Sequence, residues 1–541
     1  MHSVLRASRG AMATAAALAL YAMPHTARAA SAGLGPAEKA RVDAAMEHLV
    51  QGGVPGVELA VVRDGQVVYA QGYGFADVAA RRPIKPDTPM EVGSMTMQFT
   101  AAAVLQLVEA GKLSLDDKLG KYIPEYILGR DITLRQLLKL EGGVPDYFWQ
   151  DEVGGRIFTQ KPSFDRVLNL FEDHKLEFTP GTRWAFNNSE YFLLGQVIQR
   201  VSGQTWESYV RRNVFARAGM THTTTMAHEA GLRDFAVGYW RMHGAVGKAP
   251  KTHDLWGLAT FDVVSTVGDM AKWTAALQAG KIVDRDHVAL MMNPAPLDNG
   301  EATPLRTGVT FNNTAIENHR MVWNDGGTLG FIGINAIFPD EGLQLIVLSN
   351  ANLTIIYPSP LLSAAFFALH PEAEAVRFGP APGEDTAVTA KIRSGLLAIR
   401  AGAIGPDQAT DSLRASVNDL KPLLDQSGDI DRLVFKGQKA SDGGDELRLP
   451  GAVRARRFPV QGGDRRCRQD RRYWCHAVGR ATAARRLLLS PRLREDRTWR
   501  TATGSTVGSR AMAASARSAR GSTSSRSSGL WRGRSSGPGR R

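Results

Sequence analysis

The fold is decided by the stretch Glu91-Val-Gly-Ser-Met-Thr-Met-Gln-Phe-Thr-Ala101. A helical run from Ala102 to Ala110 follows it and is stopped by Gly111. Ser94 is therefore expected at the N-terminus of a helix, where backbone N–H groups and the helix dipole favour negative charge. Met97, three positions later, shares its helical face and can reach the serine hydroxyl. A lysine there could accept the serine proton, whereas methionine cannot.

This serine run resembles the Ser-x-x-Lys motif of the serine β-lactamases and penicillin-binding proteins, in particular their class C and esterase-like branch. The family's second motif, Tyr-x-Asn, corresponds to Phe186-Asn-Asn188. Its third, a Lys/His-x-Gly strand, corresponds to Asn324-Asp-Gly326, and its loop His-Thr-Ser-Gly-x-Pro-Asp-Tyr corresponds to Leu140–Tyr147. The resemblance covers roughly residues 34–371.

The resemblance implies a mixed α/β (α+β) fold. The expected architecture is β-lactamase/transpeptidase-like: an antiparallel sheet flanked by helices, plus an inserted all-helical lobe. Active sites of this fold lie between sheet and lobe, where Ser94, Phe186, Asn188 and Asn324 are expected to converge.

Local patterns agree with that architecture. Two β-rich runs, Val57–Arg63 and Gln66–Gly72, are joined by Asp64-Gly65, a strong two-residue hairpin signal. A second hairpin is expected where residues 333–338 and 343–349 flank a turn at 339–342. Helical patterns cover Glu190–Val201 and Thr205–Ala218.

The positions that handle protons in the family are all changed. Met97 replaces the lysine, Phe186 the tyrosine, and Asn324 the histidine or lysine, so no titratable group remains at these three places. Ser94, the nucleophile position, is kept together with Asn188. The resemblance assigns the oxyanion hole to the backbone N–H groups of Ser94 and Gly327. The sequence therefore predicts a serine hydrolase scaffold, built for acyl-serine chemistry on peptide, ester or β-lactam bonds, with impaired catalysis.

Three interpretations of these exchanges stay open. Met97 and Phe186 preserve side-chain volume while removing the polar end, which fits a non-catalytic pocket that binds peptidoglycan-like ligands. A decayed gene product would show the same exchanges. The third interpretation is a working hydrolase with a replacement base, for which Glu141 and Asp325 are the candidates.

The N-terminus predicts export. Arg6 and Arg9 precede an apolar run from Ala11 to Met23, and Ala27-Arg-Ala29 supplies small residues for cleavage. This is the pattern of a signal peptide over residues 1–29, and the run is too short for a membrane span. No later run is long enough to span. The mature chain is expected in a bacterial periplasm.

No metal or cofactor is expected from the sequence. The two cysteines, Cys467 and Cys475, lie eight residues apart beside a lone His476, which is a poor metal signal. The other histidines are scattered. A small-molecule or peptidoglycan-like ligand is the expected partner.

The C-terminal third differs in composition. Residues 372–388 read as a linker and 389–449 as an incomplete α+β segment. Residues 451–541 hold 23 Arg, no Lys and 4 acidic residues, a net charge of +19, which leaves −6 on residues 1–450. This Arg/Ser/Gly-rich tail, 450–541, is expected to be disordered, because it has too little apolar surface to form a core. It has the composition of an out-of-frame reading, which makes nucleic-acid binding a weak interpretation of its charge.

Overall fold

The computed structural model describes a folded body over residues 33–149, 161–242, 245–352 and 360–378. Beyond it, only Ala390, Ser394, Leu397, Ala398, Ala401 and the short strands at 438–441 and 444–447 are described. The predicted signal peptide, most of the segment 389–449 and the tail 450–541 lie outside the described residues. Those expectations stay predictions.

A seven-stranded sheet forms the centre of the body, with every neighbouring pair of strands antiparallel. Its strands, in spatial order, are β3 (Arg82–Pro83), β2 (Gln66–Asp77), β1 (Gly56–Arg63), β12 (Leu343–Ser349), β11 (Ile332–Phe338), β10 (His319–Gly327) and β9 (Asn312–Ile316). This confirms the predicted antiparallel sheet.

Smaller sheets accompany the central one. One joins β4 (Met90–Glu91), β8 (Val263–Ser265) and β5 (Thr224–Thr225), and another joins β13 (Ala351–Asn352), β6 (Tyr239–Met242) and β7 (Ala245–Lys248). Within the predicted segment 389–449, β14 (Gln438–Ser441) and β15 (Gly444–Leu447) form a hairpin.

Both predicted hairpins are present. Asp64 and Gly65, with φ of 49° and 78°, turn β1 into β2, and both lie in the left-handed region that a type I′ turn requires. Gly342, with φ of 62°, ends the turn from β11 into β12. The carbonyl of Gly342 accepts a hydrogen bond from the Asp64 amide at 2.8 Å, so the two turns lie side by side.

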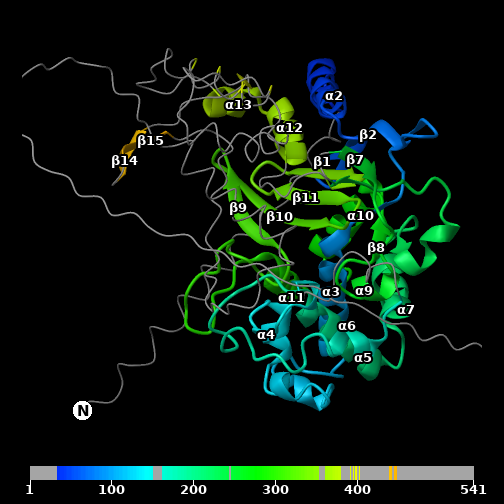
Figure 1. Cartoon of the computed structure of the whole chain (residues 1–541), viewed down its shortest axis with the longest axis vertical. Coiled ribbons are helices and arrows are strands. Elements are labelled where there is room, and N and C mark those ends of the chain that lie inside the picture. Colours follow the sequence, from blue (N-terminus) through cyan, green and yellow to red (C-terminus); the bar gives the residue numbers. More distant parts are fainter. Residues whose placement is uncertain are drawn as a thin grey trace, which may run out of the picture. The chain divides into compact units, whose positions relative to one another are not determined.

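Helices cover both faces of the sheet, as Figure 1 shows. They are α2 (Pro36–Gln51), α3 (Thr96–Glu109), α4 (Leu134–Leu138), α5 (Phe164–Leu168), α6 (Asn188–Ser202), α7 (Trp206–Val210), α8 (Ala216–Ala218), α9 (Asp254–Gly257), α10 (Val267–Gln278), α11 (Arg285–Met292), α12 (Pro360–Leu369) and α13 (Pro371–Phe378). The 3-10 helices are η1 (Gly93–Met95), η2 (Leu119–Lys121), η3 (Ile127–Gly129), η4 (Tyr147–Trp149) and η8 (Met226–Gly231), and η7 (Arg211–Phe215) is a π-helix.

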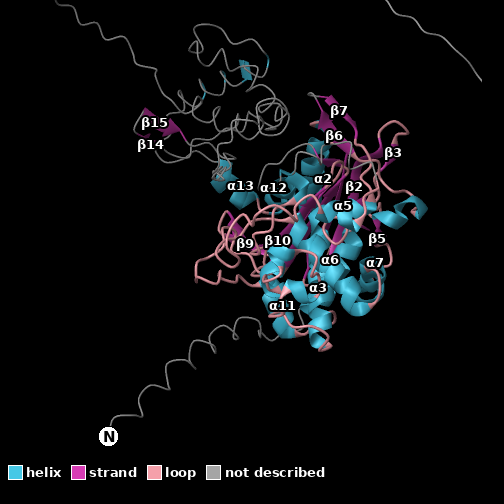
Figure 2. Cartoon of the chain, turned by 60° about the horizontal axis from the view of Figure 1, so that its bottom comes forward, coloured by secondary structure: helices cyan, strands magenta, loops and turns pink. Residues whose placement is uncertain are grey.

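The sheet separates two cores, because side chains alternate along each strand. On β1, Leu59 and Val61 face α2 and α12, whereas Ala60 and Val62 face the helical lobe. The lobe, seen as the group of helices in Figure 2, is centred on α3. Twelve of the 14 residues of α3 are buried, as expected for a helix that is apolar all round.

Three element boundaries differ from the expectations. Helix α3 starts at Thr96, six residues before the predicted run. The predicted helix Thr205–Ala218 contains the π-helix η7. Helix α13 occupies the start of the predicted linker 372–388, because Pro371 can begin a helix, Ala373 is buried and Arg377 pairs with Glu317 at 3.0 Å. The folded body thus continues to residue 378.

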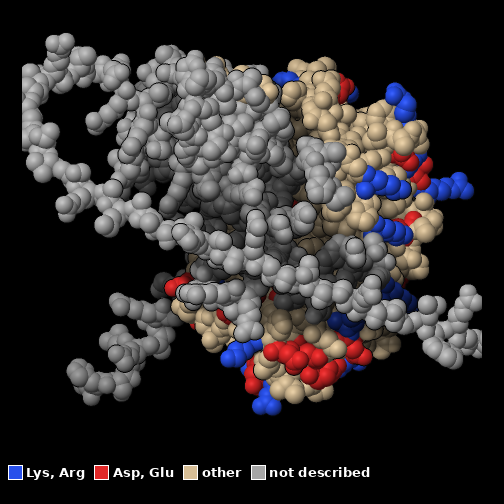
Figure 3. Space-filling view, viewed as in Figure 1, with Lys and Arg blue, Asp and Glu red and all other residues tan. Residues whose placement is uncertain are grey.

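The surface of the body carries mixed charges. Figure 3 shows Lys and Arg side chains spread over the visible described surface and carboxylates gathered at its lower end. Among the described residues, no helix combines the length and the apolar character needed to cross a membrane.

Candidate active site

Ser94 lies on a short turn that is held from both sides. It belongs to η1, and α3 follows directly. The Val92 amide donates to the Val263 carbonyl at 2.9 Å, and the Val263 amide donates to the Thr96 hydroxyl at 3.0 Å. Strand β8 thereby fixes the residues before and after Ser94. The serine itself is partly exposed, as a candidate nucleophile must be.

Two glycines of β10 lie directly against this turn. A Cβ atom built on Gly326 would lie 2.4 Å from the Ser94 amide nitrogen and 2.2 Å from the Val92 carbonyl oxygen. A Cβ on Gly93 would lie 2.4 Å from the Gly327 amide nitrogen. No side chain fits into such spaces. The structure therefore brings together the two segments whose amides, on Ser94 and Gly327, are expected to form the oxyanion hole.

Met97 lies in the first turn of α3 and is buried, with 3 % of its side chain exposed. It belongs to the core of the lobe. Its thioether cannot accept a proton at ordinary pH.

Asn324 contacts α3 through Gln98, a residue that was not among the predicted site residues. Its Oδ1 accepts from Gln98 Nε2 at 3.4 Å, and its Nδ2 donates to the Thr310 carbonyl at 2.7 Å. Gln98 in turn accepts from Trp273 Nε1 at 2.6 Å. The amide of Asn324 is therefore held in place next to the first turn of α3, but it does not titrate. A glutamine inside an apolar helical run was the signal that could have identified Gln98.

Phe186 and Asn188 lie at the start of α6, a helix packed on α3. Phe186 is 44 % exposed. Asn188 is buried and turned to the preceding loop: its backbone amide and Nδ2 both donate to Asp146 Oδ2, at 3.1 and 3.0 Å. Burial raises the pKa of Asp146 to about 6, although these hydrogen bonds oppose the shift. Within the described residues, neither side chain makes a hydrogen bond to Ser94.

Of the two candidate replacement bases, one is paired with a lysine and the other faces away from the serine. Glu141 is buried and paired with Lys139 Nζ at 2.8 Å. Asp325 and Trp323 lie two residues apart on β10, so their side chains share one face of the sheet. Trp323 packs on that face, in the core beneath α2 and α12. The side chain of Asp325 therefore points to the face of the sheet opposite Ser94. Burial raises the pKa of each carboxyl to about 7.

A further carboxyl group, that of Glu91, lies on the strand that leads into the Ser94 turn. Glu91, on β4, is buried, and the side chain of Thr328, the residue that follows Gly327, lies near its carboxyl group. Burial raises the pKa of Glu91 to about 8. The nearby Thr328 side chain and the charge of Lys251 oppose the shift, and the charge of Glu229 adds to it. Lys251 pairs with Glu229 at 2.5 Å. The Glu91 carboxyl therefore lies between the segment before Ser94 and the loop after the β10 glycines.

We expect Glu91→Gln to become steadily more stable than the wild type as pH rises from about 4.5 to about 8. The raised pKa means that folded Glu91 keeps a proton that the unfolded chain releases. Rising pH therefore penalises the folded wild type, by up to about 1.4 kcal/mol per pH unit, until the folded carboxyl also ionises. Glutamine carries no charge at any pH.

Urea unfolding of both proteins across this pH range measures the difference in the free energy of unfolding. The buried carboxyls that do not interact with Glu91 titrate in both proteins and cancel in the difference, whereas Glu229, which interacts with Glu91, contributes to it. A difference that stays constant with pH would contradict the burial of Glu91.

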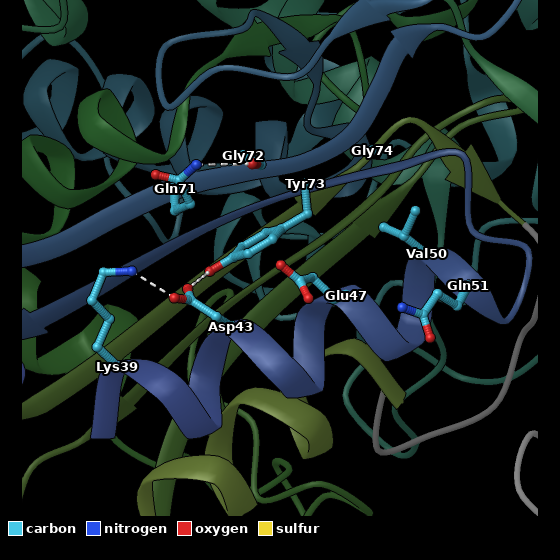
Figure 4. Close-up of a pocket in the computed structure, with 9 residues that line it drawn as sticks. All are labelled: Lys39, Asp43, Glu47, Val50, Gln51, Gln71, Gly72, Tyr73 and Gly74. Carbon is cyan, nitrogen blue, oxygen red and sulfur yellow. Dashed lines mark hydrogen bonds and ion pairs between the residues drawn. The ribbon is translucent and has the colours of Figure 1, made fainter. Parts of the chain in front are cut away.

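The cavity drawn in Figure 4 lies away from the serine, between α2 and β2, and has a volume of about 440 Å³. Asp43 is its central charge: it accepts from Tyr73 at 2.7 Å and pairs with Lys39 at 2.5 Å. Helix α2 packs on the face of the sheet opposite α3. This cavity is therefore separate from the candidate active site.

Comparison with known sequences gives a family match. The family model described as Beta-lactamase matches residues 40–355, more than half of the chain. Protein flp of Staphylococcus aureus (strain MW2) is 25% identical over 324 residues, which cover 58% of this chain and 63% of that protein. Penicillin-binding protein 4* of Bacillus subtilis (strain 168) is 25% identical over 345 residues, 61% and 76% of the two chains. The chain thus spans less than two thirds of the length of Protein flp.

Solved structures share the fold. The D-amino acid amidase of Ochrobactrum anthropi SV3 complexed with L-phenylalanine superposes with a TM-score of 0.54 at 23% identity, over 63% of this chain and 98% of that one. An octameric penicillin-binding protein homologue from Pyrococcus abyssi gives a TM-score of 0.53 at 24% identity, over 66% and 81%. At these identities the likeness establishes the fold alone.

Proposed function

The chain belongs to the beta-lactamase family, and from this premise we propose that it is a serine hydrolase scaffold with impaired acyl-transfer chemistry. Ser94 is the proposed nucleophile, and the amides of Ser94 and Gly327 the proposed oxyanion donors. One observation carries the proposal. The β10 glycines still pack against the Ser94 turn, while Met97, Phe186 and Asn324 offer no group that can take a proton.

The expected chemistry follows from a retained Ser94 turn that lacks a proton acceptor. A serine hydroxyl attacks slowly unless a neighbouring base removes its proton. In subtilisin, an unrelated serine hydrolase, loss of the nucleophile or its base costs roughly a millionfold in turnover, and about 10³–10⁴ over water remains from the oxyanion hole and binding. Slow acylation of Ser94 by activated esters is therefore expected, and efficient amide hydrolysis is not.

The proposed ligand is an acyl compound or a peptidoglycan-like peptide, met after export through the predicted signal peptide. The names of a penicillin-binding protein and a D-amino acid amidase among the similar proteins support this class. Methionine and phenylalanine at positions 97 and 186 keep apolar volume where lysine and tyrosine stand in the family. That exchange favours a retained binding site over general loss of structure, and it makes ligand binding without turnover the second candidate function.

Intact-mass spectrometry tests the proposal. The purified protein is incubated with a fluorophosphonate or, separately, a penicillin, beside a Ser94→Ala control. We expect slow adduct formation with the fluorophosphonate that the control lacks. Adduct formation at the rate of an efficient serine hydrolase would overturn the proposed impairment. An identical adduct on the Ser94→Ala control would overturn the assignment of Ser94.

A further inference from the structure

Three side chains of types that bind metals meet at one end of the β10, β11 and β12 strands, on the face of the sheet covered by α2 and α12. His319 begins β10, Glu341 lies in the turn between β11 and β12, and His370 follows α12. His319 Nδ1 lies 2.6 Å from Glu341 Oε1, and His370 Nε2 lies 2.7 Å from Glu341 Oε2. One carboxylate thus faces two imidazoles, each with a different oxygen. We call these residues the His319–Glu341–His370 cluster.

Both ring nitrogens of His370 lie within hydrogen-bond distance of an oxygen atom. Its Nδ1 lies 3.0 Å from the Phe366 carbonyl, and its Nε2 faces Glu341. Both nitrogens therefore face oxygen acceptors, but a neutral imidazole has one N–H and one lone pair. With Nδ1–H donated to the carbonyl, the Nε2 lone pair is directed at a carboxylate. Either a second ring proton or a metal cation at Nε2 satisfies the carboxylate, and a backbone partner on the other nitrogen is the usual support of a metal-bound histidine.

The two rings are held by the same aromatic residue. Phe366 stacks on His370 at 4.3 Å between ring centroids and meets the edge of His319 at 5.1 Å. Phe366 is fully buried in the core beneath α12. The imidazoles therefore have little freedom to turn away from Glu341, which lowers the entropy lost when a ligand binds.

Two guanidinium groups near the cluster are paired with other carboxylates. Arg320 pairs with Asp340 at 2.7 Å, and Arg377 pairs with Glu317 at 3.0 Å. These guanidinium groups thus have their own carboxylates. The side chains of His319, Glu341 and His370 are 27 %, 27 % and 14 % exposed, so water can reach the site and complete a coordination shell.

We propose that His319 Nδ1, Glu341 and His370 Nε2 bind a zinc ion. Two imidazoles and one carboxylate, with an open position for water, form a donor set that Zn²⁺ favours. Donor atoms on a tetrahedral zinc at about 2.0–2.1 Å lie about 3.3 Å apart. The present spacings of 2.6 and 2.7 Å need to open only slightly, by small side-chain rotations.

The proposed ion acts on stability and lies outside the chemistry at Ser94. His319 and Gly327 stand at opposite ends of β10, about 26 Å apart at the usual rise of a strand, so the ion does not reach Ser94. It ties together the start of β10, the β11–β12 turn and the end of α12. Binding is expected to stabilise the folded body without changing acylation of Ser94.

The test uses the full chain with Cys467→Ser and Cys475→Ser, which removes the thiols as competing ligands, and without a histidine tag. Metal-free protein is titrated with zinc by calorimetry, and thermal unfolding is followed with and without zinc. We expect one zinc per chain and a rise in Tm of a few degrees at saturating zinc, by mass action.

His370→Gln and Glu341→Gln supply the decisive variants. Each is expected to lose stoichiometric binding and the zinc-dependent rise in Tm while remaining folded by circular dichroism. His287→Ala is the matched control, because His287 forms another His–carboxylate group, with Glu109 and Asp284, that lacks a second histidine. It is expected to bind zinc as the parent does. No binding by the parent, or binding unchanged in both glutamine variants, would overturn the proposal.

Discussion

Combining Met97→Lys, Phe186→Tyr and Asn324→His is expected to accelerate acylation of Ser94 by a fluorophosphonate by at least about 10³-fold. The scaffold around the serine is present, so the barrier lies in the missing proton transfer. Lysine at position 97 would lie on the α3 face next to Ser94. Burial there lowers the pKa of a lysine and makes its amine a better base.

The three exchanges differ in how easily the structure accepts them. Phe186 is 44 % exposed, so a tyrosine hydroxyl meets no packed neighbour. Met97 is 3 % exposed but close to lysine in length. Asn324 is the hardest, because histidine loses the hydrogen bonds to Gln98 and the Thr310 carbonyl. We therefore expect most of the gain in acylation rate from the double variant at positions 97 and 186, and a smaller gain from position 324.

The measurement is the rate of adduct formation by intact mass, with folding checked by thermal unfolding. Met97→Gln is the matched control, since it adds polarity without a base and is expected to stay slow. Ser94→Ala in the restored protein should abolish the adduct. A restored protein that folds and still fails to react would show that the site geometry itself has been lost, which would support decay.

The sequence predicted the elements whose causes are local. Asp64-Gly65 specifies its hairpin through backbone conformation, and the apolar run after Ser94 specifies a buried helix. The alternation of side chains along a strand also predicts the orientation of Asp325. Because Asp325 is next to Asn324, its side chain must point to the opposite face of the sheet. Alternation along this strand therefore disfavours Asp325 as the replacement base.

Other features depend on contacts between distant segments. Gln98 gains its role only when β10 and α10 bring Asn324 and Trp273 to α3. The His319–Glu341–His370 cluster joins residues separated by 22 and 29 positions on three elements, so no spacing rule for metal ligands could reveal it. Helix α13 forms where composition indicated a linker, because its burial against the body is not visible in composition.

Gly326→Ala is expected to destabilise the protein by about 2–4 kcal/mol and to abolish acylation of Ser94 in the restored protein. The added methyl would lie 2.2 Å from the Val92 carbonyl oxygen and 2.4 Å from the Ser94 amide nitrogen. Both are backbone atoms, and β8 holds the turn that carries them, so neither can move aside at low cost. The turn and β10 must separate, which pulls apart the amides of Ser94 and Gly327.

Gly231→Ala is the matched control, because a Cβ there meets nothing within 4 Å. It is expected to leave stability nearly unchanged or slightly raised, since alanine restricts the unfolded chain. Urea unfolding and the acylation rate of the restored protein are measured for both variants. Gly326→Ala could abolish acylation while reducing stability by only part of the expected amount. This result would still place the β10 glycines at the oxyanion site, because the amides move before the fold is lost. If Gly326→Ala matches Gly231→Ala in both stability and rate, then the contact between β10 and the Ser94 turn, on which the proposed function rests, does not exist.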